Sequence, residues 1–278
     1  MICGPTACGK SHIADLAADL ISDKVSGYVP VVVVDSMQVF KELPIISNQH
    51  RRRPAELTGV VSVSEEWTLA RHRQFCDVIT ENLTVPLVLD AGTGMYLNAI
   101  LLDIPIAPRA PETTRERAAE LSGGESNPRR ATREMELRIM GAEDRGSIWE
   151  GQLRYETTVL YVRPDRGELD NAIALRSAYI AHEGLEEAAA LLELFPEEVP
   201  ITSVQGAIGV KELIDHLQGG LAFDEAEREI GTRTRRLARR QIRWFDKLTR
   251  TLNGRASVHV TDDLHKATTV VKDYVNRL

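Results

Sequence analysis

The sequence predicts an α/β fold in which helices cover both faces of a parallel β-sheet. Two apolar runs, residues 29–35 and 85–90, have the length and the branched side chains of buried parallel strands, and each ends in an aspartate. Residues 157–162 form a third such run. Helical patterns lie between the runs, as in residues 11–21, where Ile13, Leu16 and Leu20 share one face. This alternation of strand and helix is typical of a parallel sheet.

Composition limits the class of protein. The 278 residues are 43% hydrophobic, which supplies a core for one large domain or for one domain with a smaller insert. The net charge of −7 excludes a general nucleic-acid coat protein, so any polyanion must be held by a local basic patch. The apolar stretches are shorter than the roughly 18 residues of a membrane span, and the chain opens into a glycine-rich motif where a signal peptide would stand. We expect a cytoplasmic monomer without membrane contact.

The predicted organisation is a core interrupted by an insert. From residue 107 to residue 155, prolines and a dense scatter of Arg and Glu replace the strand pattern, which predicts a small helical insert or lid. Residues 1–106 and 156–278 then form the core. In the final third we predict helices over residues 168–183, 185–195, 210–217 and 224–250.

The chain begins with a phosphate-binding motif. Residues 4–11, GPTACGKS, match the P-loop pattern GxxxxGK[ST], and an amphipathic helix follows. Backbone N–H groups of such a loop and the helix N-terminus attract phosphate, while Lys10 neutralises charge and the Ser11 hydroxyl binds Mg²⁺. Only three residues precede the loop, so we expect either a brief first strand or a start of translation upstream. A P-loop NTPase-like parallel sheet with flanking helices is therefore predicted. The expected diphosphate ligands in the loop are Gly4, Thr6, Ala7, Cys8, Gly9, Lys10 and Ser11.

Two further motifs follow strands at the same edge of the sheet. Asp35 begins the segment DSMQVF, and this aspartate can ligate Mg²⁺, as in a kinase, or act as a general base on an acceptor. Thr93 lies between Gly92 and Gly94 after the next strand, which suits a hydroxyl directed at the phosphates. Together with the P-loop, these residues indicate an active site that handles a di- or triphosphate.

The last long predicted helix carries a concentration of arginine. Helical spacing places Arg235, Arg239 and Arg243 on one line, and such lines repel unless acids or phosphates meet them. Three interpretations stay open: a solvated face paired with Glu225, Glu227 and Glu229, a diphosphate site, or contact with an RNA backbone.

Taken together, these motifs resemble the dimethylallyl (isopentenyl) transferases that modify adenine in tRNA. The resemblance is carried by GPTACGKS at 4–11, DSMQVF at 35–40, DAGTGMYLNAIL at 90–101, AIGVKEL at 207–213 and TRRLARRQIRWF at 234–245. It implies transfer of a dimethylallyl group from dimethylallyl diphosphate, with Mg²⁺, to the exocyclic N6 of the adenine 3′ of the tRNA anticodon. The chain would be a compact, divergent member of that family.

The resemblance also implies roles for individual residues. Asp35 matches the general base, Thr93 the threonine beside the bridging oxygen, and Lys10 the P-loop lysine. Arg176 and Arg235 are implied as further diphosphate ligands. The implied acceptor contacts are Asp35, Ser36, Met37 and Gln38 around a flipped-out adenine, Arg115, Arg129, Arg130 and Arg133 in the insert, and Lys211.

Other acceptors and another chemistry stay open. The segment 41–66 departs from the family pattern and the insert is short, which favours relatives that prenylate AMP to make cytokinins. The motifs at 207–213 and 234–245 are of the tRNA type and favour tRNA. A P-loop kinase acting on a small molecule is the alternative of a different class, and it would bind and turn over ATP. A non-catalytic RNA-binding module is disfavoured because Lys10, Ser11, Asp35 and Thr93 are all present.

Overall fold

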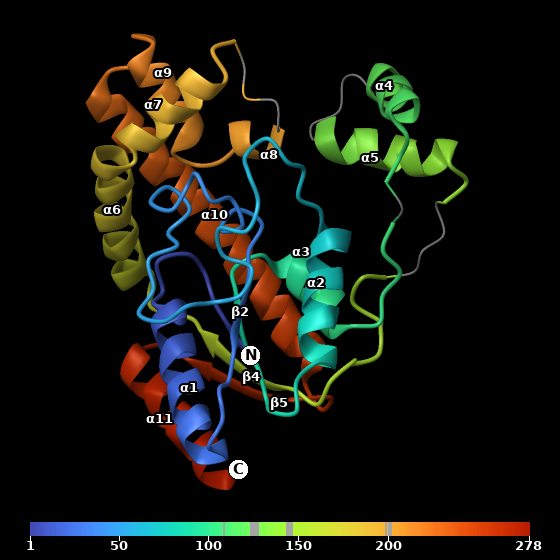
Figure 1. The fold of residues 1–278 in the computed structure, drawn as a ribbon, viewed down its shortest axis with the longest axis vertical. Coiled ribbons are helices and arrows are strands. Elements are labelled where there is room, and N and C mark those ends of the chain that lie inside the picture. Colours follow the sequence, from blue (N-terminus) through green and yellow to red (C-terminus); the bar gives the residue numbers. More distant parts are fainter. Residues whose placement is uncertain (108, 123–127, 143–146, 198, 200–201) are drawn as a thin grey trace.

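A computed structural model describes residues 1–107, 109–122, 128–142, 147–197, 199 and 202–278 of the chain. Its centre is a five-stranded parallel sheet with the order β2-β3-β1-β4-β5 (Figure 1). The strands are β1 (Ile2–Cys3), β2 (Val31–Val34), β3 (Val88–Ala91), β4 (Thr158–Val162) and β5 (Ser257–Thr261). The predicted α/β class and its parallel sheet are confirmed.

The central strand, β1, is short, with only Ile2 and Cys3. It pairs with β3 on one side, Ile2 opposite Asp90, and with β4 on the other, Ile2 opposite Leu160. The predicted regions 29–35 and 157–162 contain β2 and β4, and the region 85–90 overlaps β3, which ends one residue later. We did not predict β5, because this edge strand alternates apolar and polar residues and most of its side chains are partly or fully exposed.

Helices cover both faces of the sheet. On one face, α1 (Lys10–Val25) packs with α11 (Leu264–Arg277), and Ile13, Ile21 and Val271 form the core there with apolar residues of the strands. On the other face lie α2 (Leu69–Glu81), α3 (Gly94–Leu101) and α10 (Phe223–Leu252), whose side chains belong to the larger core. Since β1 ends in the P-loop at the start of α1, this packing fixes the loop at the carboxyl edge of the sheet.

A group of helices extends from that edge. The group comprises α6 (Arg166–Glu183), α7 (Leu185–Leu194), α8 (Thr202–Gln205), α9 (Val210–Leu217) and the first half of α10 (Figure 1). The four helices predicted in the final third are found within two residues of their predicted ends. The helix α6 runs along α10, and their contact includes Leu169, Ile173 and Ala238, against which Ala7 of the P-loop also packs.

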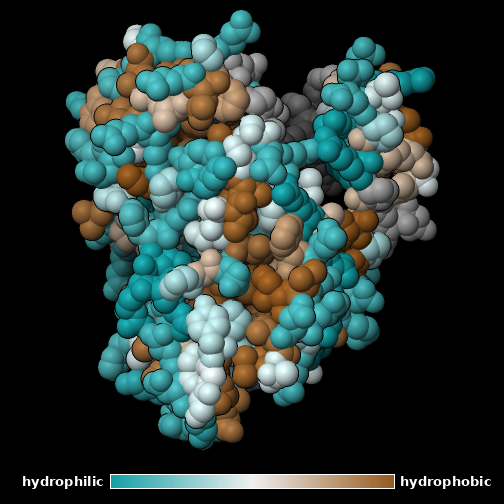
Figure 2. All heavy atoms as spheres, viewed as in Figure 1, coloured by the Kyte–Doolittle hydropathy of each residue, from teal (hydrophilic) through white to brown (hydrophobic). Residues whose placement is uncertain are grey.

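The predicted insert is helical where the structure describes it. It contains α4 (Glu112–Leu121) and α5 (Pro128–Ile139), which pack against each other. This pair stands apart from the other labelled helices in Figure 1, and Figure 2 shows the outline of the molecule notched between it and the end formed by α7 and α9. The division into a core and a 107–155 insert stays a prediction. Among the helices of the described residues, none has both the length and the apolar character of a membrane span.

Candidate active site at the carboxyl edge of the sheet

The P-loop has the tight backbone that its glycines permit. A Cβ atom on Gly4 would lie 2.5 Å from the Val162 carbonyl oxygen, so a side chain there would displace the neighbouring strand. Gly9 precedes α1 with φ of 79°, a left-handed conformation that glycine adopts without strain. These positions turn the chain from β1 into α1 and direct the N-terminus of α1 at the edge of the sheet, where an anion is favoured.

Lys10 and Ser11 begin α1 beside this loop. Lys10 is almost fully buried, and its Nζ lies 3.5 Å from the Pro5 carbonyl oxygen. The Ser11 side chain is partly exposed. Cys8 is buried in the loop, and burial raises the pKa of its thiol although Lys10 acts in the opposite direction. The Cys8 thiol is therefore uncharged where it lines the loop, and the neighbouring cation is Lys10.

Asp35, Thr93 and Lys10 converge around Gly92. The Asp35 carboxylate accepts hydrogen bonds at Oδ1 from the Met37 amide at 2.8 Å and the Gln38 amide at 3.4 Å. Thr93 Oγ1 lies 3.5 Å from Asp35 Oδ2, and accepts from the Ser36 amide at 3.2 Å. A Cβ atom on Gly92 would be 2.6 Å from Asp35 Oδ2 and 3.7 Å from Lys10 Nζ. The structure therefore brings together the three residues expected to be catalytic.

Gln241, which the sequence analysis missed, joins two of these loops. Its Oε1 accepts from the Thr6 amide of the P-loop at 2.8 Å, and its Nε2 donates to the Gly92 carbonyl at 2.9 Å. Gln241 lies on the buried stripe of α10 between Ala238 and Phe245. An amide at a core position of an amphipathic helix needs buried partners, and that position was the available signal.

Arg176 faces the same space from α6. Its guanidinium is partly buried and has no hydrogen bond or ion pair with any described residue. Burial lowers the pKa of Arg176, and the negative charge of Asp35 opposes that shift. An unpaired guanidinium near the P-loop is suited to a diphosphate. Arg235 lies 3.9 Å from Asp170 instead, and no described contact joins it to the P-loop, so its role as a ligand stays a prediction.

The arginines of α10 present a partly unpaired basic strip. Arg236, Arg240 and Arg243 are exposed, and none forms an ion pair within the part of the chain that the structure describes. Arg233 differs, because it pairs with buried Glu212 and donates to the Gly206 carbonyl at 2.7 Å. Arg236, Arg240 and Arg243 are therefore not paired with the glutamates at 225, 227 and 229, as the first of the three interpretations had it.

The expected acceptor residues occupy separate elements. Ser36 and Met37 are half-buried beside Asp35, and Gln38 is buried behind them. In the insert, Arg115 lies 3.9 Å from Glu112 on α4, and Arg133 pairs with Glu136 on α5. The side chains of Arg129 and Arg130 lie outside the described residues. Lys211, on α9, pairs with Asp215, which raises its pKa. Among the expected acceptor residues whose side chains the structure describes, those at 36–38 are the ones that adjoin Asp35 and Thr93.

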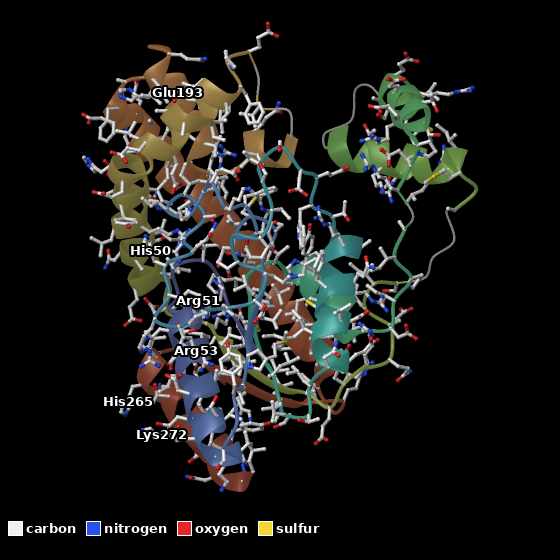
Figure 3. All side chains as sticks on the ribbon, in the orientation of Figure 1. His50, Arg51, Arg53, Glu193, His265 and Lys272 are labelled. Atoms are coloured by element: carbon white, nitrogen blue, oxygen red, sulfur yellow. The ribbon has the colours of Figure 1, made fainter. Side chains whose placement is uncertain are left out.

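A second cluster missed from the sequence lies at the start of α1. Arg51 comes from the loop after β2 and forms ion pairs with Asp15 of α1 at 2.6 Å and with Asp90 of β3 at 2.8 Å. The side chains of all three are at most 4% exposed. The run Arg51-Arg52-Arg53 has the composition of a solvated surface segment. In the structure, however, Arg52 and Arg53 also form ion pairs with α1, both with Asp19 (Figure 3 shows Arg51 and Arg53 beside α1).

Comparison with known proteins identifies the family of this chain. The family model for IPP transferase matches residues 123–248. A tRNA dimethylallyltransferase of Rubrobacter xylanophilus is 52% identical over 262 residues, which are 94% of this chain and 90% of that protein. The structure of tRNA isopentenylpyrophosphate transferase from Staphylococcus epidermidis is similar with a TM-score of 0.72 at 19% identity, covering 100% of this chain and 98% of that one.

A eukaryotic dimethylallyltransferase described as acting on tRNA is similar with a TM-score of 0.73 at 20% identity, covering 99% of this chain and 79% of that one. The two structural likenesses confirm the P-loop NTPase-like fold. Sequence identity of 52% across nearly the full length of both proteins establishes more than the fold: the chain belongs to the tRNA dimethylallyltransferase family.

Proposed function

We propose that this enzyme transfers a dimethylallyl group from dimethylallyl diphosphate to N6 of the adenine 3′ of a tRNA anticodon. Membership of the family supports the reaction. The observation that carries the proposal is the convergence of a carboxylate, a hydroxyl and an ammonium, from Asp35, Thr93 and Lys10, around Gly92. This group places a proton acceptor beside a site built for a phosphate leaving group.

The donor diphosphate binds in the P-loop. Its oxygens accept from the backbone amides of residues 4–11, which precede a helix N-terminus, and Lys10 and Arg176 flank it with positive charge. Diphosphate leaves readily only when its developing negative charge is neutralised, and cations held in place before the reaction do this without further reorganisation. Thr93 completes the site by donating its hydroxyl to the bridging oxygen.

The residues present fit Mg²⁺. Within the described residues no group of three or more His, Cys, Asp or Glu side chains is placed to hold a metal ion. Mg²⁺ does not need such a group, because it commonly binds through one or two protein oxygens, the phosphates of a substrate and several waters. Ser11 supplies the protein hydroxyl, and when bound the ion adds positive charge to the leaving diphosphate.

Asp35 acts as the general base. As N6 attacks the allylic carbon, the new N–C bond forms, the C–O bond breaks, and its electron pair leaves with the diphosphate. The amine proton moves to Asp35 Oδ2, which has a long contact of 3.5 Å with the Thr93 hydroxyl, whereas Oδ1 accepts from the amides of Met37 and Gln38. The two amides hold the carboxylate in one orientation. The adenine must leave its stack to reach this carboxylate, with Ser36 and Met37 beside it.

The RNA is held farther from the reacting atoms. Arg115, Arg129, Arg130 and Arg133 of the insert, Lys211 of α9 and the exposed strip of Arg236, Arg240 and Arg243 supply positive charge for the phosphate backbone. A chain with a net charge of −7 needs such local patches to bind RNA.

A transfer assay tests the proposal. The enzyme is incubated with labelled dimethylallyl diphosphate, Mg²⁺ and unmodified tRNA, and label in the RNA is counted and mapped to the base. We expect label at the adenine 3′ of the anticodon, and its loss with Asp35→Asn. Parallel reactions contain ATP in place of the donor. Consumption of ATP with a small-molecule acceptor, without prenyl transfer, would replace this function by a kinase.

A further inference from the structure

The turn that carries Thr93 is held by α10 on both sides. Gln241 donates to the Gly92 carbonyl oxygen at 2.9 Å. About one helical turn further along α10, the indole of Trp244 packs against Gly94. This contact lies where α3 meets the long helix α10 (Figure 1). Thr93 therefore lies between two residues that α10 fixes.

The indole of Trp244, and not the backbone, requires glycine at position 94. A Cβ atom on Gly94 would lie 2.2 Å from Cδ1 and 2.5 Å from Nε1 of Trp244, so a larger residue would displace the ring. Gly94 is the first residue of α3 and its φ is not positive, so its backbone conformation is open to other residues. The glycine thus allows the ring to approach the start of α3 closely.

Trp244 is itself held by the end of the insert. Its Nε1 donates to Asn98 Oδ1 at 3.1 Å, and Asn98 Nδ2 donates to the Ile148 carbonyl oxygen at 3.0 Å. Asn98 is fully buried, so both bonds are shielded from water. The ring of Trp149 packs beside that of Trp244, with 4.9 Å between the ring centroids. A hydrogen bond and an aromatic neighbour together fix the direction of the indole.

The orientation of Thr93 depends on both ends of this turn. The Thr93 amide donates to the Val34 carbonyl oxygen at 3.0 Å, which ties the turn to β2. Its hydroxyl accepts from the Ser36 amide at 3.2 Å and lies 3.5 Å from Asp35 Oδ2. On the side of α3, the atoms that adjoin Gly94 most closely belong to Trp244. A displacement of about 1 Å in an active site can lower a rate about 100-fold, so a small shift of this turn would matter.

We propose that Trp244 is a positioning residue for the transfer reaction: it keeps Gly94 in place and thereby holds the Thr93 hydroxyl at the bridging oxygen of the leaving diphosphate. This inference rests on the proposed function, which gives Thr93 its role. Because Trp244 acts through Thr93, its loss slows the chemical step and leaves the binding of both substrates nearly unchanged. Asn98 and Trp149 contribute by fixing the indole.

Two equal substitutions separate this role from a general loss of packing. Trp244→Phe keeps an aromatic ring but removes the N–H that Asn98 accepts. Trp67→Phe is the matched control, because it also removes an indole N–H from a buried acceptor, His72 Nδ1 at 3.0 Å. Trp67 belongs to the same core but packs on His72 and Phe75 of α2. Both variants lose one hydrogen bond and part of a ring, whereas Trp244 alone of the two covers Gly94.

The measurement is single-turnover transfer from labelled dimethylallyl diphosphate to unmodified tRNA. We expect Trp244→Phe to lower the rate about tenfold or more, with the KM for tRNA and the Kd for inorganic diphosphate within about twofold of the parent. Trp67→Phe should leave the rate within about twofold of the parent, because its loss does not reach the turn. Equal losses of rate in the two variants, or none in Trp244→Phe, would overturn the inference.

A second pair of variants tests whether Trp244 acts through Thr93. Thr93→Val replaces the hydroxyl by a methyl group and should itself slow transfer. In that background Trp244→Phe should lower the rate less than about twofold further, because no hydroxyl is left to misplace. Effects that multiply in the double variant, or a normal rate in Thr93→Val, would overturn the inference.

The remaining controls concern folding and the reaction itself. Thermal unfolding verifies that each variant folds. If Trp244→Phe does not fold, Gly94→Ala serves in its place, because the added methyl group would meet Trp244 Cδ1 at 2.2 Å and move the ring. Its rate should fall in the parent background and fall no further with Thr93→Val. Absence of labelled RNA with the parent enzyme would instead overturn the proposed function.

Discussion

The proposed donor and acceptor regions of this enzyme are built differently. Around the donor site, hydrogen bonds join residues far apart in sequence, as Gln241 does between Thr6 and Gly92, and most of the atoms are buried. In the proposed acceptor region, charged residues pair with neighbours three or four positions away, as Arg115 does with Glu112 and Lys211 with Asp215, and their side chains remain at least partly exposed. Exposed pairs of this kind contribute about 0–1 kcal/mol, so RNA phosphates can replace them. The fold therefore fixes the donor site before substrate binds and leaves the acceptor surface adaptable.

The largest expected effect comes from removing the proposed general base, Asp35. Asp35→Asn should lower the single-turnover rate of transfer about 10²- to 10⁴-fold, the usual contribution of a general base, while diphosphate binding stays within about twofold. Lys10→Ala is the contrast, because it removes the cation facing the diphosphate and should weaken binding itself. Rapid-quench kinetics and calorimetry separate the two. Wild-type turnover in Asp35→Asn would refute the assignment of the base.

The second effect tests whether the donor site depends on its long-range hydrogen bonds. Gln241→Met leaves the Thr6 amide and the Gly92 carbonyl without their partner, which should lower the free energy of unfolding by about 2–4 kcal/mol and weaken diphosphate binding. Thr234→Val is the control on the same buried stripe, since the Thr234 hydroxyl bonds only to Ile230 of its own helix. Urea denaturation measures stability. Equal losses in the two variants would mean that Gln241 has no special role.

A third test concerns how stability depends on pH through a buried histidine. His72 of α2 is buried against Trp67, whose Nε1 donates to its Nδ1 at 3.0 Å, and burial lowers the pKa of His72 from 6.5 to about 4. Between these values the unfolded chain binds a proton that the folded one does not. Stability should therefore fall by about 1.4 kcal/mol for each pH unit below 6.5, until the pH reaches about 4.

A substitution of His72 gives the control for this prediction. His72→Gln cannot titrate but still offers an oxygen to Trp67, so its stability should decline less steeply over that pH range. Denaturant unfolding of both proteins at several pH values between 4 and 7 measures the difference. Parallel pH curves for the two would show that His72 is not the group responsible.

The smallest effect concerns the acceptor side. Arg115→Gln should raise the KM for tRNA a few-fold, and the slope of log affinity against log salt should become shallower by about 0.7–0.9, as expected for one lost phosphate contact. Arg115→Lys keeps the charge and should keep the slope. Binding of diphosphate should not change in either variant. A slope that is the same in all three proteins would remove Arg115 from the RNA surface.

Local signals in the sequence predicted the fold class and the candidate residues that the structure groups around Gly92. The P-loop, the buried strands ending at Asp35 and Asp90, and the helices of the final third each have a pattern within a short window. Asp35 and Thr93 could be placed together because carboxyl ends of parallel strands share one edge. The strand β5 was missed because an exposed edge strand lacks a continuous apolar run.

Partners distant in sequence could not be predicted in the same way. Arg51 lies in a run of three arginines typical of a solvated segment, and only the folded chain shows it between Asp15 and Asp90. Gln241 is polar on an apolar stripe, which indicates a buried partner but does not say which one. For the arginines of α10, periodicity gave their alignment, whereas their pairing depends on how α6 and α9 pack beside them.

The central claim is that a fixed donor site serves an acceptor bound through an exposed basic surface. The most direct test offers unmodified tRNA and AMP in parallel to the enzyme with labelled dimethylallyl diphosphate and Mg²⁺, at increasing salt. We predict label in tRNA, with a kcat/KM that falls steeply as salt rises, and little label in AMP. Efficient, salt-insensitive labelling of AMP with little label in tRNA would contradict the claim, because the basic surface would then have no RNA to bind.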